Sequence, residues 1–238
     1  MWKRLHSSSS TSTRAGSAPR FTPDTGQSNI LRLPREVRDN IYRMVFYVAH
    51  PLYLFQDTDS QIEVFGPERP PQWLALLHVN RQIHAEAAES LFGTVHFVLL
   101  DEKRAQGCLL QAFLTRIGSA NSASLSHLSM DFPNLEGTME ELKMRDDSLQ
   151  RFQSLQESCT NLTTLEISFS ARHSRDLNRL AGESLPLIKE ALSQINSQLQ
   201  VVPSLQNIVV RVTAPNPAVS IMDCMRSLGW NVVPASGA

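Results

Sequence analysis

Apolar residues recur every three or four positions in two stretches near the start of the chain, which predicts two helices. In the first stretch, Pro34 stands where a first helical turn tolerates the missing N–H. Its apolar stripe is Val37, Ile41, Met44, Val45 and Val48, and the residues expected to face water are Arg35, Arg38, Asp39 and Arg43. The second stretch has the stripe Leu76, Val79, Ile83, Ala87 and Leu91, and its polar face carries Arg81, Gln82, His84, Glu86 and Glu89.

Between these helices the period changes. Two short apolar runs, 52–55 and 62–65, flank the turn-forming segment 57–60, which predicts a β-hairpin. Three prolines end the hairpin at positions 67, 70 and 71. The aromatic residues of this region are Tyr53, Phe55, Phe65 and Trp73. We expect them to pack in the core, and the alternative is an exposed anchor for a protein partner.

Farther along, four segments share the pattern apolar-x-x-apolar-x-apolar. They are Phe92/Val95/Phe97, Leu125/Leu128/Met130, Leu162/Leu165/Ile167 and Leu205/Ile208/Val210, with steps of 33, 37 and 43 residues between their middle positions. Helical patterns lie between them at about 104–117, 139–159 and 175–200, and a fifth unit covers 217–233. We therefore expect Leu128, Leu165 and Ile208 to be buried in neighbouring strands.

Strands that alternate with helices predict an α/β fold with a mainly parallel sheet. The N-terminal part is of α+β type, with two helices and an inserted hairpin. The phrases around Leu165 and Ile208 are typical of irregular leucine-rich repeats, in which strands line one wall and helices the other. We favour such a leucine-rich-like layer, and a closed doubly wound sheet is the alternative.

Residues 1–28 differ in composition from the rest. They hold seven Ser and four Thr, a net charge of +3 and few apolar side chains, so we expect them to be disordered. The expected division of the chain is therefore a tail at 1–28, a helical module with the hairpin at 29–98, and a strand–helix region at 99–238. A basic, Ser-rich tail is also how a mitochondrial transit peptide reads, as a minor alternative to a cytoplasmic or nuclear location.

Charge and cysteine content narrow the classes of function. Lys plus Arg is 22 and Asp plus Glu is 23, which gives no overall attraction to nucleic acids or acidic membranes. No apolar run approaches the length of a membrane span. The three cysteines, Cys108, Cys159 and Cys224, are far apart, so we expect buried, unreactive thiols in an intracellular protein.

Motifs that carry catalysis are absent from the sequence. It contains no glycine-rich phosphate loop, no G-x-S-x-G, no C-x-x-C and no H-E-x-x-H. The nearest approach to a metal site is His78 with His84 and Glu86, but residues six apart on a helix do not share a face. We therefore expect a protein that is not an enzyme, with no catalytic residues, no metal ligands and no cofactor. An enzyme of unrecognised type is the weaker alternative, because catalytic groups meet in space rather than in sequence, and whether a small molecule binds is left open.

Two blocks of sequence together resemble a known family. The segment Leu33-Pro-Arg-Glu-Val-Arg-Asp-Asn-Ile-Tyr42 is similar to the L-P-x-E-[IV]-R-x-x-I-Y opening of fungal F-box-like proteins. The segment Leu76-Leu-His-Val-Asn-Arg-Gln-Ile-His-Ala-Glu-Ala87 resembles the second block of that family, and 91–97 resembles its leucine-aromatic stretch. The resemblance covers residues 31–98, and the pair of blocks in this order is fairly specific.

The resemblance implies an F-box-type helical module followed by a variable α/β region. F-box domains bind a Skp-type adaptor and link a substrate-recruiting domain to a cullin ubiquitin ligase. By resemblance, the residues that would contact the adaptor are Leu33, Pro34, Val37, Ile41 and Tyr42. The alternative is a binding protein of the same fold that does not bind the adaptor, and exposure of the first helix distinguishes the two hypotheses.

Overall fold

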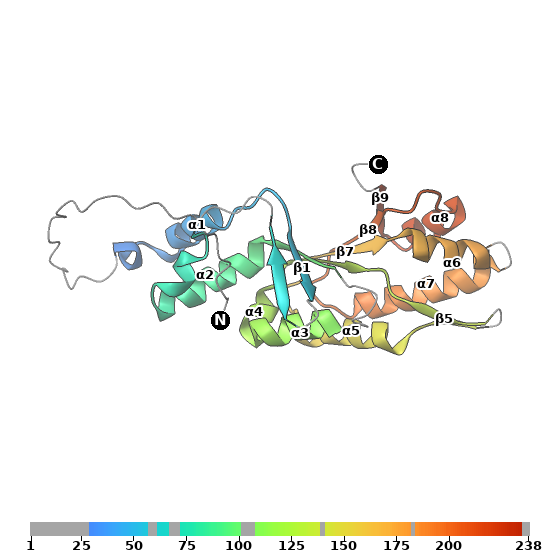
Figure 1. The fold of residues 1–238 in the computed structure, drawn as a ribbon, viewed down its shortest axis with the longest axis horizontal. Helices are drawn as coiled ribbons and strands as arrows, with labels where there is room; N and C mark the ends of the chain where they lie inside the picture. The colour runs from blue at the N-terminus through green and yellow to red at the C-terminus, as the bar shows by residue number, and fades with distance from the viewer. Residues whose placement is uncertain are drawn as a thin grey trace, which may run out of the picture.

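The computed structural model describes residues 29–56, 61–66, 72–100, 108–138, 141–181 and 184–234. The tail at 1–28 and the hairpin turn at 57–60 lie outside the described residues. Within them the chain has a mixed α/β fold with eight α-helices and a mostly parallel seven-stranded sheet (Figure 1).

The N-terminal part contains the two predicted helices and the predicted hairpin. A short 3-10 turn, η1 (Asn29–Arg32), leads into α1 (Arg35–Val45), and Pro34 lies just before the helix. Strands β1 (Leu52–Gln56) and β2 (Ile62–Phe65) pair in antiparallel fashion. A second 3-10 turn, η2 (Ala75–His78), precedes α2 (Arg81–Thr94). The side chain of Asn80 caps α2 by accepting a hydrogen bond from the Ile83 amide at 2.9 Å.

The rest of the described chain alternates strands and helices. The strands of the main sheet are β3 (His96–Leu99), β4 (His127–Asp131), β7 (Thr164–Phe169), β8 (Asn207–Val212) and β9 (Asn231–Pro234). The helices between them are α3 (Cys108–Ile117), α4 (Ser119–Ser124), α5 (Asp146–Ser158), α6 (Ala171–Ala181), α7 (Leu185–Gln200) and α8 (Val219–Ser227). A separate two-stranded sheet is formed by β5 (Leu135–Gly137) and β6 (Leu142–Met144).

Two of the predicted helices were wrong in extent. The pattern at 139–159 begins with strand β6, whose burial alternates with the period of a strand, and α5 starts only at Asp146. The pattern at 175–200 is two helices, α6 and α7, rather than one. Pro186 lies in the first turn of α7, where proline fits the start of a helix but would break its interior.

Strand order in the main sheet follows the chain from β1 to β9, and β2 lies outside β1 at one edge. The order is β2-β1-β3-β4-β7-β8-β9; β2 is antiparallel to β1, and every other neighbouring pair is parallel. A doubly wound sheet reverses the order of its parallel strands at a switch point, and the described parallel strands, from β1 to β9, show no such reversal. Connections between neighbouring parallel strands are right-handed, so when successive strands are neighbours the connecting helices lie on one face of the sheet. Figure 1 accordingly shows α3, α5 and α7 along one side of the sheet.

The two faces of the sheet differ in polarity. Leu128, Leu165 and Ile208 are buried in register on neighbouring strands, as predicted. They belong to the apolar face, which is covered by the helices. The alternate positions form what we call the polar face, which carries His96, His127, Ser129, Glu166 and Arg211.

The register of the first strand differs from the repeat pattern. Phe97 of β3, rather than Val95, pairs with Leu128 of β4. The segment Phe92/Val95/Phe97 is therefore shifted by two residues relative to the other three. Both Val95 and Phe97 are buried, so the shift keeps apolar side chains in the core.

The two cysteines whose side chains the structure describes are buried, as the sequence predicted. Cys159 and Cys224 are buried free thiols. Burial raises the pKa of Cys159 to about 12, so its thiol stays protonated at neutral pH.

Candidate functional site

Helix α1 lies against α2 at one end of the molecule (Figure 1). The side of α1 that meets α2 is formed by Arg38, Tyr42 and Phe46, all buried. Arg38 and Glu86 were both expected to face water, and this prediction was wrong. The two side chains face each other across the helix pair, and each satisfies the other's charge, which is what allows a charged group to be buried.

Glu86 is the centre of a dense hydrogen-bond network between α1 and α2. The Arg38 guanidinium donates from Nε to Glu86 Oε2 and from Nη2 to Oε1, both at 2.7 Å. The Tyr42 hydroxyl donates to Glu86 Oε2 at 2.9 Å, and Gln82 Nε2 donates to Oε1 at 3.0 Å. The bond from Arg38, together with those from Gln82 and Tyr42, lowers the pKa of Glu86 to about 2 despite its burial. The carboxylate is therefore ionised at neutral pH and holds α1 in one orientation.

The same network positions the segment before α1. Arg38 Nη1 donates a hydrogen bond to the backbone carbonyl of Leu33 at 2.6 Å. Leu33 and Pro34 are both exposed, and the backbone that carries them is tied to the buried Arg38. The hydrogen bond from Arg38 thus fixes the backbone at Leu33, and with it the position of the exposed side chains of Leu33 and Pro34.

Because Arg38, Tyr42 and Phe46 occupy the inner side of α1, several apolar residues on its opposite side point outward. Val37 is 42% exposed, Met44 77% and Tyr47 75%, and Leu33 is exposed at 37%. We call Leu33, Val37, Met44 and Tyr47 the α1 strip. The half-buried Ile41 lies one turn from Val37 and borders the strip.

Four of the five residues that the resemblance assigns to adaptor contact are at this surface. Leu33, Pro34 and Val37 are exposed, and Ile41 is half-buried. Tyr42 is completely buried, and its hydroxyl serves Glu86 inside the helix pair. Met44, which the sequence placed in the apolar stripe of this helix, and Tyr47 also belong to the strip, although the resemblance assigned neither to adaptor contact.

The hairpin and the aromatic residues leave the α1 strip uncovered. Trp73 packs edge-on against Phe46 beneath α1, with ring centroids 6.1 Å apart. Tyr53 and Phe65 pair with each other across the hairpin, and Phe65 is exposed. Two hollows of about 390 and 350 Å³ lie beside α1, and Arg43 lines both of them.

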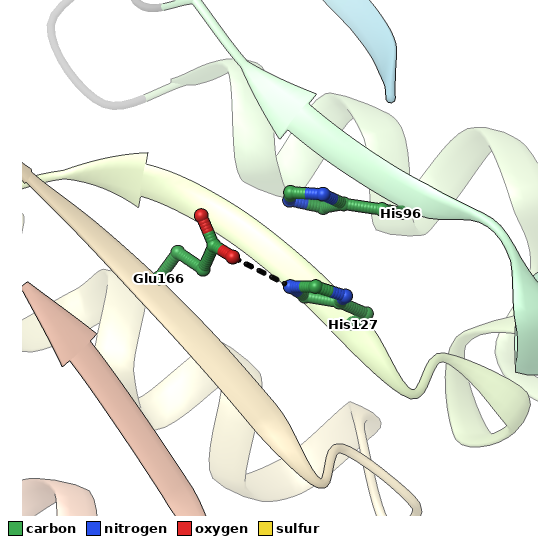
Figure 2. Close-up of side chains that lie close together, drawn as sticks. All are labelled: His96, His127 and Glu166. Atoms are coloured by element: carbon green, nitrogen blue, oxygen red, sulfur yellow. Dashed lines mark hydrogen bonds and ion pairs between the residues drawn. The ribbon is translucent and has the colours of Figure 1, made fainter. Parts of the chain in front are cut away.

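A second polar cluster lies on the polar face of the sheet (Figure 2). The rings of His96 and His127 are stacked, with centroids 3.7 Å apart and planes 3° from parallel. His127 Nε2 donates to Glu166 Oε1 at 3.1 Å. Arg211 forms a two-pronged ion pair with the same carboxylate, through Nε to Oε2 and through Nη2 to Oε1. Ser129 Oγ lies 2.6 Å from His96 Nε2 and donates to Glu166 Oε2 at 3.4 Å.

Burial and charged neighbours shift the pKa values of Glu166 and His96 in this cluster. Burial by itself would raise the pKa of Glu166, but the hydrogen bonds from His127 and Arg211 outweigh it and hold the pKa well below the usual range. Burial, with His127 beside it, lowers the pKa of His96 to about 4. The Glu166 side chain is 7% exposed and that of His127 31%, so the cluster is sheltered but reachable from solvent.

The sequence pointed to a different set of histidines. His84 Nδ1 contacts the Leu77 carbonyl at 2.6 Å, and Glu86 turns inward to Arg38, so His78, His84 and Glu86 form no joint site. His96, His127 and Glu166 are 31 and 39 residues apart in sequence. The sequence could have indicated this cluster only through an alignment of Phe97 with Leu128, which places His96 beside His127.

No protein-family model, no curated protein and no solved structure matched this chain when it was compared with all three. Among the described residues, no helix is long and apolar enough to cross a membrane.

Proposed function

We propose that this protein is a non-enzymatic interaction module that binds a Skp-type adaptor through the α1 strip, in the manner of an F-box protein. The observation that carries the proposal is the outward position of the apolar residues of α1. Leu33, Val37 and Met44 are exposed although they are apolar. Contiguous exposed apolar residues of this kind usually mark a contact surface for another protein.

The spacing of these residues fits a helix that docks into a groove. Val37, Ile41 and Met44 follow one another at four and three residues, so they lie on one side of α1. Helix-in-groove recognition uses anchors at this spacing. The sequence from Leu33 to Tyr42 resembles the F-box opening, and this resemblance is the reason for proposing a Skp-type adaptor as the protein that binds the strip.

The buried network supports the proposal in a second way. Arg38, Tyr42 and Glu86 fix α1 on α2 from the inner side, so the strip does not hold the helix in place. Because the strip contributes little to the stability of the fold, its exposed apolar side chains are better explained by contact with another protein. Preorganisation of the helix also lowers the entropic cost of binding.

The sheet supplies the second half of such a module. We propose that the parallel strands β1, β3, β4, β7, β8 and β9 form a leucine-rich-like layer that presents a variable surface to a recruited protein. The strand order without reversal and the covered apolar face support this reading over a doubly wound sheet. The alternative is a binding protein of the same fold without adaptor binding, in which the α1 strip contacts another protein.

Titration of the purified protein with a purified Skp-type adaptor tests the proposal. Replacing Leu33 and Pro34 with Ala, or Val37 and Met44 with Asp, should abolish binding while the thermal midpoint stays close to that of the wild type. Val219→Asp is the matched control, because Val219 is 71% exposed but lies at the start of α8. The adaptor proposal is wrong if the wild type does not bind, or if the Val37 and Met44 variant binds as well as the control.

A further inference from the structure

Three metal-ligating side chains converge on the polar face of the sheet. His96, His127 and Glu166 lie on the neighbouring strands β3, β4 and β7, and each offers a ligand atom within 4.8 Å of the others (Figure 2). The register places His96 directly beside His127, and Glu166 lies one strand farther along. We propose that these three side chains bind a divalent transition-metal ion of the zinc class. The proposal is independent of adaptor binding.

The distances are close to those a metal site requires. Ligand atoms bound at about 2.0–2.1 Å to a tetrahedral zinc ion are roughly 3.3–3.4 Å apart. His127 Nε2 and Glu166 Oε1 are already 3.1 Å apart. The rings of His96 and His127 are stacked in nearly parallel planes, so one ring must turn about its side-chain bonds for both nitrogens to point at one ion.

The donor set selects the class of ion. Two imidazole nitrogens and one carboxylate suit zinc, copper or nickel, whereas magnesium and calcium require mostly oxygen ligands. Three protein ligands leave a coordination position for water, and the 31% exposure of the His127 side chain leaves a path for it.

Arg211 has two opposite effects on such a site. Its ion pair with Glu166 fixes the carboxylate, as hydrogen bonds to ligating carboxylates commonly do. Its positive charge also lies close to the proposed cation and weakens binding. In a cluster that is only an ion pair, removing Arg211 would not create metal affinity. In a metal site, removing it should strengthen binding, because the repulsion between two cations in a sheltered site exceeds the cost of losing one outer-shell contact.

The test uses the full-length protein without a histidine tag, cleared of metal with a chelator and titrated with Zn²⁺ at neutral pH. We expect one zinc ion per chain. His96→Gln and His127→Gln should each weaken the affinity by at least about tenfold, because each removes a ligand and even the loss of an outer-shell partner costs about that much. Arg211→Gln should tighten it. His84→Gln, which changes an exposed histidine outside the cluster, should leave the affinity unchanged.

Spectra of the Co²⁺-loaded protein give a second readout. Visible absorption bands of four-coordinate cobalt should develop at one equivalent and disappear in the His96→Gln and His127→Gln double variant. Circular dichroism of each variant verifies that it is folded. The proposal is overturned if the wild type binds no stoichiometric Zn²⁺, or if the folded double variant binds as the wild type does.

Discussion

Replacing Leu165 with Ala should destabilise the protein by about 2–5 kcal/mol, the range measured for buried leucines. Leu165 is at the middle of the parallel sheet, 0% exposed, and its register partners are Leu128 and Ile208. The substitution removes three carbon groups, worth roughly 0.8 kcal/mol each or about 2.4 kcal/mol in transfer from water. The remaining cost is that of the cavity, because neighbours fixed in strands on both sides can relax only in part.

Urea denaturation followed by circular dichroism measures this loss. For a protein of this size, 1 kcal/mol shifts the thermal midpoint by about 2–4 °C, so the midpoint should fall by roughly 4–20 °C. Met44→Ala is the control, because Met44 is 77% exposed and should change stability by no more than about 0.5 kcal/mol. A loss at Leu165 as small as that of the control would mean that β7 does not lie between β4 and β8.

Three further predictions concern buried polar groups. Glu86→Gln should flatten the pH dependence of stability between about pH 4.5 and 2, because the folded-state pKa of about 2 lies below the ordinary value of 4.5. This carboxylate therefore stabilises the fold above that window, and the effect is lost as pH falls through it. Urea midpoints that fall equally with pH in the variant and the wild type would refute this. Tyr42→Phe should cost about 1–3 kcal/mol in urea denaturation, since it removes the hydroxyl that donates to the charged Glu86, and an unchanged stability would contradict that role. The ring of His173 is half-buried beside Phe132 and Phe169, and burial lowers its pKa to about 4, so NMR should show it titrating near pH 4. The neutral ring stabilises the fold above about pH 6.5, and this contribution is lost as the pH falls toward 4. A titration near pH 6.5 would show that the ring is exposed.

The apolar pattern was informative wherever one side of an element meets the core. Leu128, Leu165 and Ile208 were predicted as neighbours because each is the middle apolar residue of the same short pattern, and the strands that carry this pattern pair in register. The hairpin strands β1 and β2 followed from their two apolar runs. In these elements the alternation of side chains fixes which residues are buried.

The same reasoning failed for α1 because it assumes that charges face water. Arg38 and Glu86 are 48 residues apart, and nothing local in either helix signals that the two side chains meet. Burial of a charge depends on the presence of a partner, which is a property of the tertiary structure. The apolar residues Val37 and Met44 do share one side of α1, but that side is exposed.

The polar cluster was missed for a reason of register. The repeat pattern pairs Val95 with Leu128, whereas the structure pairs Phe97 with Leu128. These two alignments of β3 differ by two residues, and a shift of two leaves every side chain on the same face of the sheet. The hydrophobic pattern therefore cannot distinguish the two alignments. Only the second places His96 next to His127, and the pairing of backbone hydrogen bonds between β3 and β4 decides it.

Hydrogen–deuterium exchange of the protein with and without a saturating Skp-type adaptor tests the central proposal most directly. The α1 strip should be covered in the complex, so peptides that span residues 33–48 should exchange more slowly when the adaptor is present. Peptides from α7 and α8, which lie toward the opposite end of the molecule from α1 (Figure 1), should exchange at unchanged rates. Unchanged exchange at 33–48, or protection confined to another part of the molecule, would contradict the assignment of α1 as the docking surface.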